Sequence, residues 1–153
     1  MFFFNRKYCG GPVCSCAADL VGKIVVLTGG TSGIGLAVTT EIAKRGAVTI
    51  FTARNLTQGI QVRDKIIAQT GNPNIYCKQL DLNNFSSIHT FVSQLKLGSY
   101  SNIDILINNA GTFFHPPEKT VDGYDVTFQT NYLGVFLYES YSFHDNNWNH
   151  LFS

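Results

Sequence analysis

The eight residues TGGTSGIG at positions 28–35 decide the fold of this 153-residue chain. The apolar, β-branched run KIVVL precedes them, which is typical of a strand buried on both faces of a parallel sheet. Ile34, Val38 and Ile42 follow at helical spacing and predict a helix over 34–45. A turn between such a strand and a helix gathers unpaired backbone N–H groups and the positive end of the helix dipole. It therefore predicts a phosphate-binding site.

The glycines and hydroxyls of this loop each have an expected role. Gly29 permits the tight turn, Gly33 leaves room for a pyrophosphate, and Gly35 lets the helix pack close to the strand. Thr31 and Ser32 can donate hydroxyl hydrogen bonds to phosphate oxygens. The spacing G-x-x-x-G-x-G is neither the G-x-G-x-x-G fingerprint nor a Walker loop, so a tight turn that binds no ligand is the alternative.

Strand and helix patterns alternate along the chain. Strands are expected over 23–28, 47–53, 74–80 and 102–108, and helices over 34–45, 56–69, 85–98 and 122–141. In the last helix, Phe128, Tyr132, Val135 and Phe136 lie on one side. This alternation predicts an α/β fold with right-handed βαβ units and a parallel sheet covered on both faces. We expect an N-terminal arm at 1–22, a domain at 23–141 and an irregular tail at 142–153.

Arg54 follows the second predicted strand, where an acidic residue that binds the ribose 2′-hydroxyl of NAD would stand. No Asp or Glu lies between Gly46 and Arg63. A guanidinium there suits a 2′-phosphate through charge-assisted hydrogen bonds, which favours NADP(H). An ordinary solvated charge at the end of a strand is the alternative.

Two further strand ends carry polar or small residues. Asp81 and Leu82 follow the third predicted strand, where a carboxylate can accept from an adenine amine while the next backbone N–H donates to the ring. Capping of the following helix by Asp81 is a competing interpretation, and both can hold. The sequence NNAG at 108–111 follows the fourth strand and faces the same crevice, since ligands of open α/β sheets bind at the carboxyl ends of strands.

Composition argues against several other classes of function. The formal net charge is +1 and no basic block is long enough to follow a nucleic acid, so we expect no nucleic-acid partner. No stretch reaches the about 20 apolar residues of a membrane span. The four cysteines, Cys9, Cys14, Cys16 and Cys77, match neither a disulfide framework nor a zinc site, so we expect free thiols in a reducing compartment and no metal.

The ordered motifs TGGTSGIG, Asp81-Leu82, NNAG and TNYLG (130–134) resemble those of the short-chain dehydrogenase/reductases over residues 20–140. The segments ARN and KTVDGYDVTFQTNYLGVF look like the retinol dehydrogenase branch. The resemblance implies a Rossmann-type fold, here incomplete with about four strands, and an oxidoreductase that uses NADP(H) on retinol, retinal or related lipid alcohols and aldehydes. It is compatible with a homo-oligomer.

The resemblance also implies roles for individual residues. The pyrophosphate site comprises Gly29, Thr31, Ser32, Gly33, Ile34 and Gly35, with Arg54 and Asn55 at the 2′-phosphate, Asp81 and Leu82 at the adenine, and Asn108, Ala110 and Gly111 at the nicotinamide-side ribose. Asn131 matches the asparagine that holds a water in the family's proton relay. No Tyr-x-x-x-Lys occurs in the chain, whose last lysine is Lys119, and the family's serine strand is missing too. A non-catalytic NADP-binding fragment or isoform is therefore the alternative.

The two ends of the sequence allow more than one interpretation. MFFFNRK at the start is either a loose arm or, as the branch implies, the remnant of a membrane anchor, which would place the protein inside the cell at the endoplasmic reticulum or another membrane surface. SYSFHDNNWNHLFS at the end does not resemble the family's continuation and is expected to be an alternative end. We expect His144 and His150 to be solvated rather than catalytic.

Overall fold

The computed structural model describes residues 18–98, 100 and 102–143. Its elements are β1 (Ile24–Leu27), α2 (Gly33–Lys44), β2 (Val48–Ala53), α3 (Leu56–Thr70), β3 (Ile75–Gln79), α4 (Phe85–Leu97), β4 (Ile105–Ile107), α5 (Val126–Phe128), a π-helical turn (Gln129–Leu133) and α6 (Gly134–Phe143). The expectations for most of the N-terminal arm, for Cys9, Cys14 and Cys16 and for the end of the tail lie outside the described residues.

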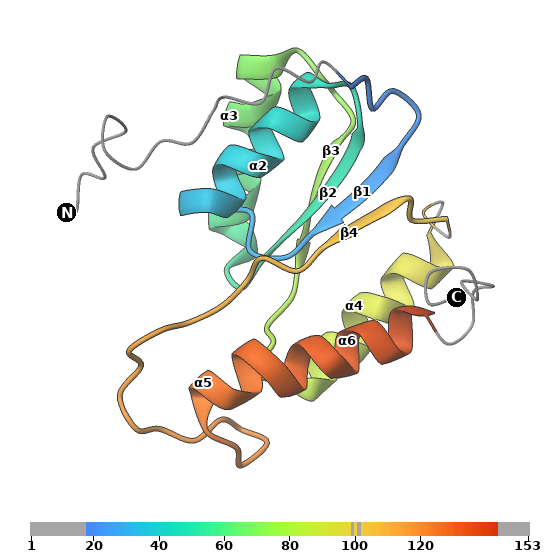
Figure 1. The fold of residues 1–153 in the computed structure, drawn as a ribbon. Helices are drawn as coiled ribbons and strands as arrows, with labels where there is room; N and C mark the ends of the chain where they lie inside the picture. Colours follow the sequence, from blue (N-terminus) through green and yellow to red (C-terminus); the bar gives the residue numbers. More distant parts are fainter. Residues whose placement is uncertain (1–17, 99, 101, 144–153) are drawn as a thin grey trace.

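The four strands form one parallel sheet in the order β3-β2-β1-β4 (Figure 1). The chain crosses from β1 to β2 and from β2 to β3 on one side of the sheet. It then returns past β1 and adds β4 on the other side of β1. The predicted α/β, Rossmann-type sheet is therefore confirmed. All strands point the same way, so their carboxyl ends meet along one edge of the sheet.

Helices cover both faces of the sheet, with α2 and α3 on one side and α4 and α6 on the other (Figure 1). Neighbouring residues of β1 point to opposite faces: Val25 packs with the α2–α3 layer, whereas Val26 packs with the α4–α6 layer. Both side chains are fully buried. A strand buried on both faces explains why Ile24–Leu27 is continuously apolar instead of alternating.

The predicted helix over 122–141 is wrong at its start. Residues before Val126 form a turn in which Gly123 has φ 86° and Lys119 bridges to Asp125. Asp125 caps α5 by accepting a hydrogen bond from Phe128 N at 2.8 Å. The helix therefore begins four residues later than its apolar pattern suggested.

The aromatic side of this last helical segment faces outward. Phe128, Tyr132 and Phe136 are 50, 60 and 62% exposed, while Gln129 and Tyr138 are fully buried. The inward side packs on α4, where Tyr138 meets Phe91 with ring centroids 5.7 Å apart. The apolar pattern on the sequence therefore marked a face that lies open in the described part of the chain.

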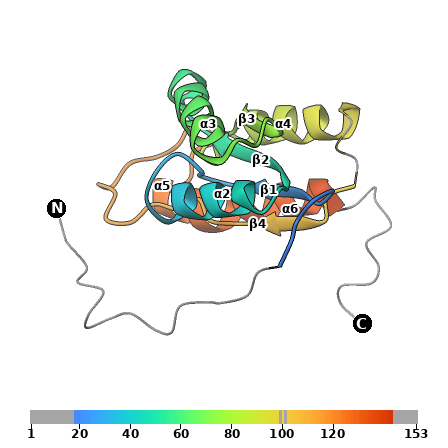
Figure 2. The same ribbon diagram turned by 90° about the horizontal axis from the view of Figure 1, so that it is seen from above.

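The fourth strand is shorter than expected. It contains only Ile105–Ile107, paired with β1 and carrying no further strand within the described residues. In both views the segment that links β4 to α5 swings out beyond the sheet before it returns (Figure 1, Figure 2). None of the helices in the described ranges is long and apolar enough to cross a membrane.

Candidate functional site

A cavity of about 610 Å³ lies along the carboxyl ends of the strands. Residues from the β1–α2 loop, from the ends of β2 and β3 and from the segment after β4 line it. Of the predicted site residues, all line this cavity except Asn55, Asn108 and Asn131. The fold therefore brings together groups that are up to about eighty positions apart in the sequence, as the crevice rule for open α/β sheets expects.

The glycines of the β1–α2 loop differ in their backbone conformation and in the space around them. Gly29 has φ 73°, and a Cβ there would lie 2.9 Å from Ala110 Cα. A Cβ on Gly35 would lie only 2.1 Å from the Gly29 carbonyl oxygen, so the helix approaches its own loop too closely for any side chain. Gly33 has φ 54° and open space where its Cβ would be. These features show the tight turn at Gly29 and the close packing at Gly35, and the pyrophosphate role expected for Gly33 stays a prediction.

The first turn of α2 offers unpaired donors to this space. Ser32 occupies the N-cap position without making a side-chain cap, and the first backbone hydrogen bond of the helix runs from Leu36 N to Ser32 O at 3.1 Å. Among the described residues, no acceptor is recorded for the N–H groups of Gly33, Ile34 and Gly35. No acidic side chain lies in this turn. A phosphate is the ligand that such a helix start stabilises.

Arg54 follows β2 directly and lines the same cavity. Within the part of the chain that the structure describes, its guanidinium makes no ion pair and no hydrogen bond, and only its carbonyl oxygen accepts one, from Gln79 Nε2. Asn55 lies outside the lining and caps α3, with Oδ1 accepting from Gln58 N at 3.0 Å. An exposed, unpaired guanidinium can reach a phosphate without first breaking an ion pair.

Asp81 and Leu82 lie where the third strand ends. Asp81 Oδ1 accepts a hydrogen bond from Asn83 N at 3.0 Å, which leaves the second carboxylate oxygen for a ligand. The cap of α4 is Asn84, whose Oδ1 accepts from Ser87 N, so Asp81 does not cap this helix. No hydrogen bond among the described residues uses the Leu82 N–H. An acceptor and a donor thus lie side by side, as an adenine edge requires.

The two asparagines of NNAG differ in direction. Asn108 does not line the cavity, because its Nδ2 donates to Glu139 Oε1 on α6 at 2.5 Å. Asn109 does, and its Nδ2 donates to the carbonyl oxygens of Thr28 and Gly29 at 3.0 and 3.1 Å. The Thr28 hydroxyl accepts in turn from the backbone of Asn109 and Ala110. This network ties the end of β4 to the glycine loop, a role that the motif alone did not reveal.

Asn131 lies within the π-helical turn between α5 and α6. Its Oδ1 accepts from Thr112 N and its Nδ2 donates to Thr112 O, both at 2.8 Å. The side chain therefore fixes the backbone of the segment that follows Gly111 at the mouth of the cavity. The proton-relay role expected for Asn131 stays a prediction.

Comparison with known proteins agrees with this geometry. A family model described as short chain dehydrogenase matches residues 23–142. The chain belongs to the short-chain dehydrogenase family. Relatives of this short-chain dehydrogenase chain include retinol dehydrogenase 12 of Mus musculus, 38% identical, and retinol dehydrogenase 11 of Homo sapiens, 37% identical, each over 132 residues. Both alignments span 86% of this chain but only 42% and 41% of the relative.

Solved structures of other short-chain dehydrogenases have a similar arrangement of sheet and helices. The Pseudomonas aeruginosa RhlG/NADP active-site complex superposes with a TM-score of 0.68 at 25% identity, covering 83% of this chain and 47% of that one. A metagenomic short-chain oxidoreductase in complex with NADP gives 0.67 at 26% identity, covering 81% and 56%. The described sheet and helices thus correspond to about half of these proteins.

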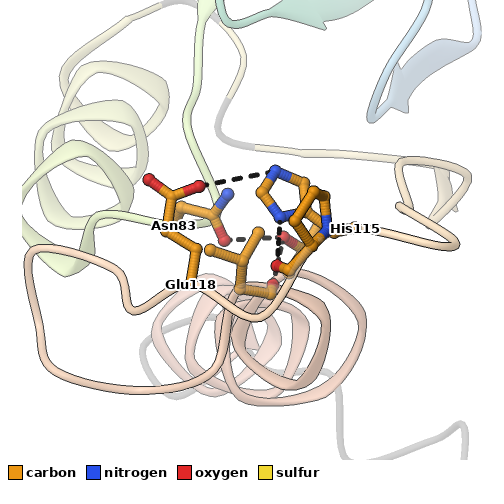
Figure 3. A network of polar contacts seen from close by, with 6 residues as sticks. Asn83, His115 and Glu118 are labelled. Carbon is orange, nitrogen blue, oxygen red and sulfur yellow. Dashed lines mark hydrogen bonds and ion pairs between the residues drawn. The ribbon is translucent and has the colours of Figure 1, made fainter.

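The sequence motifs did not identify some of the residues that line the cavity of this short-chain dehydrogenase. Asn83, Thr130 and His115 also line the cavity, and Figure 3 shows Asn83 and His115 within one network of polar contacts. Thr130 Oγ1 lies 2.6 Å from Asn83 Oδ1 and 2.7 Å from Val126 O, so it links α5 to the end of β3. Asn83 directly follows the predicted Asp81-Leu82 pair, and that adjacency was the one signal in the sequence that could have included it.

Proposed function

We propose that this chain binds NADP(H) as part of an oxidoreductase that interconverts retinol and retinal or related lipid alcohols and aldehydes. One observation carries the cofactor assignment. The unpaired Arg54 guanidinium lies in the same cavity as the donor-rich start of α2, and among the described residues Asp81, at the end of the next strand, is the one carboxylate in its lining. Positive charge on Arg54 and at the start of α2 favours a dinucleotide that carries a 2′-phosphate in addition to its pyrophosphate.

The residues that line the cavity fit the cofactor group by group. The α2 start would hold the pyrophosphate, Arg54 the 2′-phosphate, and Asp81 with Leu82 the adenine edge. Asn108 and Asn55 remain proposed contacts that would require their side chains to leave Glu139 and the α3 cap. The bound cofactor would give the hydride to an aldehyde or take it from an alcohol, and this chain's own residues would bind and orient the cofactor.

The lipid substrate is supported by the relatives, which are named retinol dehydrogenases. A lipid substrate of this kind would place the protein at a membrane surface, and we propose the endoplasmic reticulum or another intracellular membrane. For the 153 residues by themselves we propose cofactor binding without turnover, because no Tyr-x-x-x-Lys is present to exchange a proton with the substrate. The second candidate function is accordingly that of a non-catalytic NADP-binding isoform.

Two measurements on the purified chain test these proposals. The first is a fluorescence titration with NADPH and with NADH, in which we expect NADPH to bind at least about tenfold more tightly, the value of one charge-assisted contact. The second is NADPH oxidation with all-trans-retinal, in which we expect no turnover. Equal affinity for both cofactors would contradict the NADP(H) assignment, and turnover would contradict the non-catalytic one.

A further inference from the structure

His115 belongs to the segment after β4 and lies in the cavity wall, with its side chain 32% exposed. The two residues before it face solvent, since Phe113 and Phe114 are 80 and 89% exposed. Phe114 has φ 54°, a left-handed conformation that is sterically unfavourable for a residue with a Cβ. At this strained residue the chain passes from two solvent-exposed aromatic rings to an imidazole that lines the cavity. Strain of this kind persists where the surroundings require it and is enriched at ligand-binding sites.

The contacts of the imidazole identify its open atom. Nδ1 lies 3.0 Å from Pro116 O, and because a carbonyl oxygen only accepts, Nδ1 carries the hydrogen. Nε2 lies 3.9 Å from the Glu118 carboxylate, which is too far for a hydrogen bond (Figure 3). No hydrogen bond to Nε2 is recorded from any residue within the described ranges. In the neutral ring Nε2 is therefore an acceptor without a donor.

The position of His115 indicates which part of a ligand it meets. His115 and Asn83 line the same cavity and belong to one network of polar contacts (Figure 3), and Asn83 directly follows Asp81 and Leu82. Asp81 offers a carboxylate oxygen, and Leu82 offers its backbone N–H, to one edge of a purine. An adenine amine has two hydrogens, and Asp81 can accept only one of them from its side. A second acceptor at this end of the cavity completes the recognition of the amine.

We propose that His115 is a base-specificity residue whose Nε2 accepts the second amine hydrogen of the adenine of NADP(H). The proposal rests on the proposed cofactor. It predicts a preference for adenine over hypoxanthine, in which a carbonyl oxygen replaces the amine. His115 thus acts from the β4 side of the cavity, while Asp81 and Leu82 act from the β3 side.

The test compares wild type with His115→Ala, His115→Gln and Phe113→Ala in titrations with NADPH, 2′,5′-ADP and the hypoxanthine analogue of NADPH. We expect His115→Ala to weaken NADPH and 2′,5′-ADP by the same factor, about three- to tenfold, and to weaken the hypoxanthine analogue less. His115→Gln keeps an acceptor near the position of Nε2 and should retain most of the affinity. Phe113→Ala alters the same segment at an exposed site and should bind like wild type. Thermal unfolding of each variant shows whether it is folded.

Two results would overturn the assignment. Unchanged affinities in His115→Ala would remove His115 from the site, and a loss for NADPH without a loss for 2′,5′-ADP would move it to the nicotinamide end. If wild type binds neither NADPH nor 2′,5′-ADP, the proposed cofactor itself fails and the inference with it. If wild type binds both ligands and His115→Ala binds them equally well, the proposed cofactor is retained and only the role of His115 is rejected.

Discussion

Gly35 packs so tightly against Gly29 that a Cβ on the first would lie 2.1 Å from the carbonyl oxygen of the second. Real Cβ atoms do not approach an oxygen so closely, so any side chain at Gly35 must push α2 away from the loop. The loop cannot follow freely, because Gly29 O also accepts a hydrogen bond from Asn109 Nδ2 at 3.1 Å. The shape of the proposed phosphate site therefore depends on this contact.

Gly35→Ala should abolish measurable NADPH binding and lower the unfolding temperature, because the start of α2 must move. Fluorescence titration and thermal unfolding check these two effects. Gly71→Ala is the matched control: Gly71 ends α3 with φ 72° and open space around it, so alanine there should cost about 1 kcal/mol of stability and leave NADPH binding intact. Equal loss of binding in both variants would mean that instability, and not the loop, is responsible.

Asp104→Asn should remove part of the acid sensitivity of folding. Asp104 binds Lys23 Nζ at 2.7 Å and the backbone N–H of Ile24 at 2.8 Å, and these two contacts hold the pKa of its carboxyl below the ordinary value. A lowered pKa in the folded state stabilises the fold above the unfolded pKa of about 3.9 and loses that contribution as pH falls through the lowered value.

Unfolding midpoints in urea between pH 7 and pH 2 check the Asp104 prediction. The wild-type midpoint should fall more steeply below about pH 4 than that of Asp104→Asn. High salt should reduce the difference, because the pair is exposed and salt screens it. Parallel curves for the two proteins would show that Asp104 contributes nothing to the pH dependence.

Gln129→Leu should destabilise the protein although the two side chains have similar volume. Gln129 is fully buried, donates to Asp122 Oδ2 at 2.6 Å and contacts the Thr120 hydroxyl. Leucine leaves both partners short of a hydrogen bond, which costs about 1–3 kcal/mol. Chemical unfolding measures the loss, with Thr90→Ala on the exposed side of α4 as a control expected within about 0.5 kcal/mol of wild type. A stability like that of wild type would show that water satisfies Asp122 and Thr120 instead.

The buried strands could be predicted from the sequence because burial on both faces leaves a continuous apolar signal. Strand β1 was expected over 23–28 and occupies Ile24–Leu27, and β2 and β3 agree equally well. Local signals also fixed the helix ends, since Asn55 and Asn84 cap α3 and α4 with their own side chains. For these elements the local and the tertiary preferences agree.

Features that depend on distant partners could not be predicted. The start of the last helix is set by Asp122, which is engaged by Phe85 N and Gln129 instead of joining the helix. Asn108 and Asn109 are equivalent in the motif, and only the positions of Glu139 and Gly29 decide which one faces the cavity. His115 enters the cavity wall through the positive φ of Phe114, a conformation that no residue preference of phenylalanine suggests.

The affinity of Arg54→Ala for NADPH and for NADH tests the central claim most directly. Arg63→Ala on α3, where the arginine is paired with Asp64 at the surface, is the control for loss of positive charge. If Arg54 binds the 2′-phosphate, Arg54→Ala should weaken NADPH by about 10- to 100-fold, leave NADH within about twofold of wild type, and Arg63→Ala should change neither. Equal losses of NADPH and NADH affinity in Arg54→Ala would contradict the account.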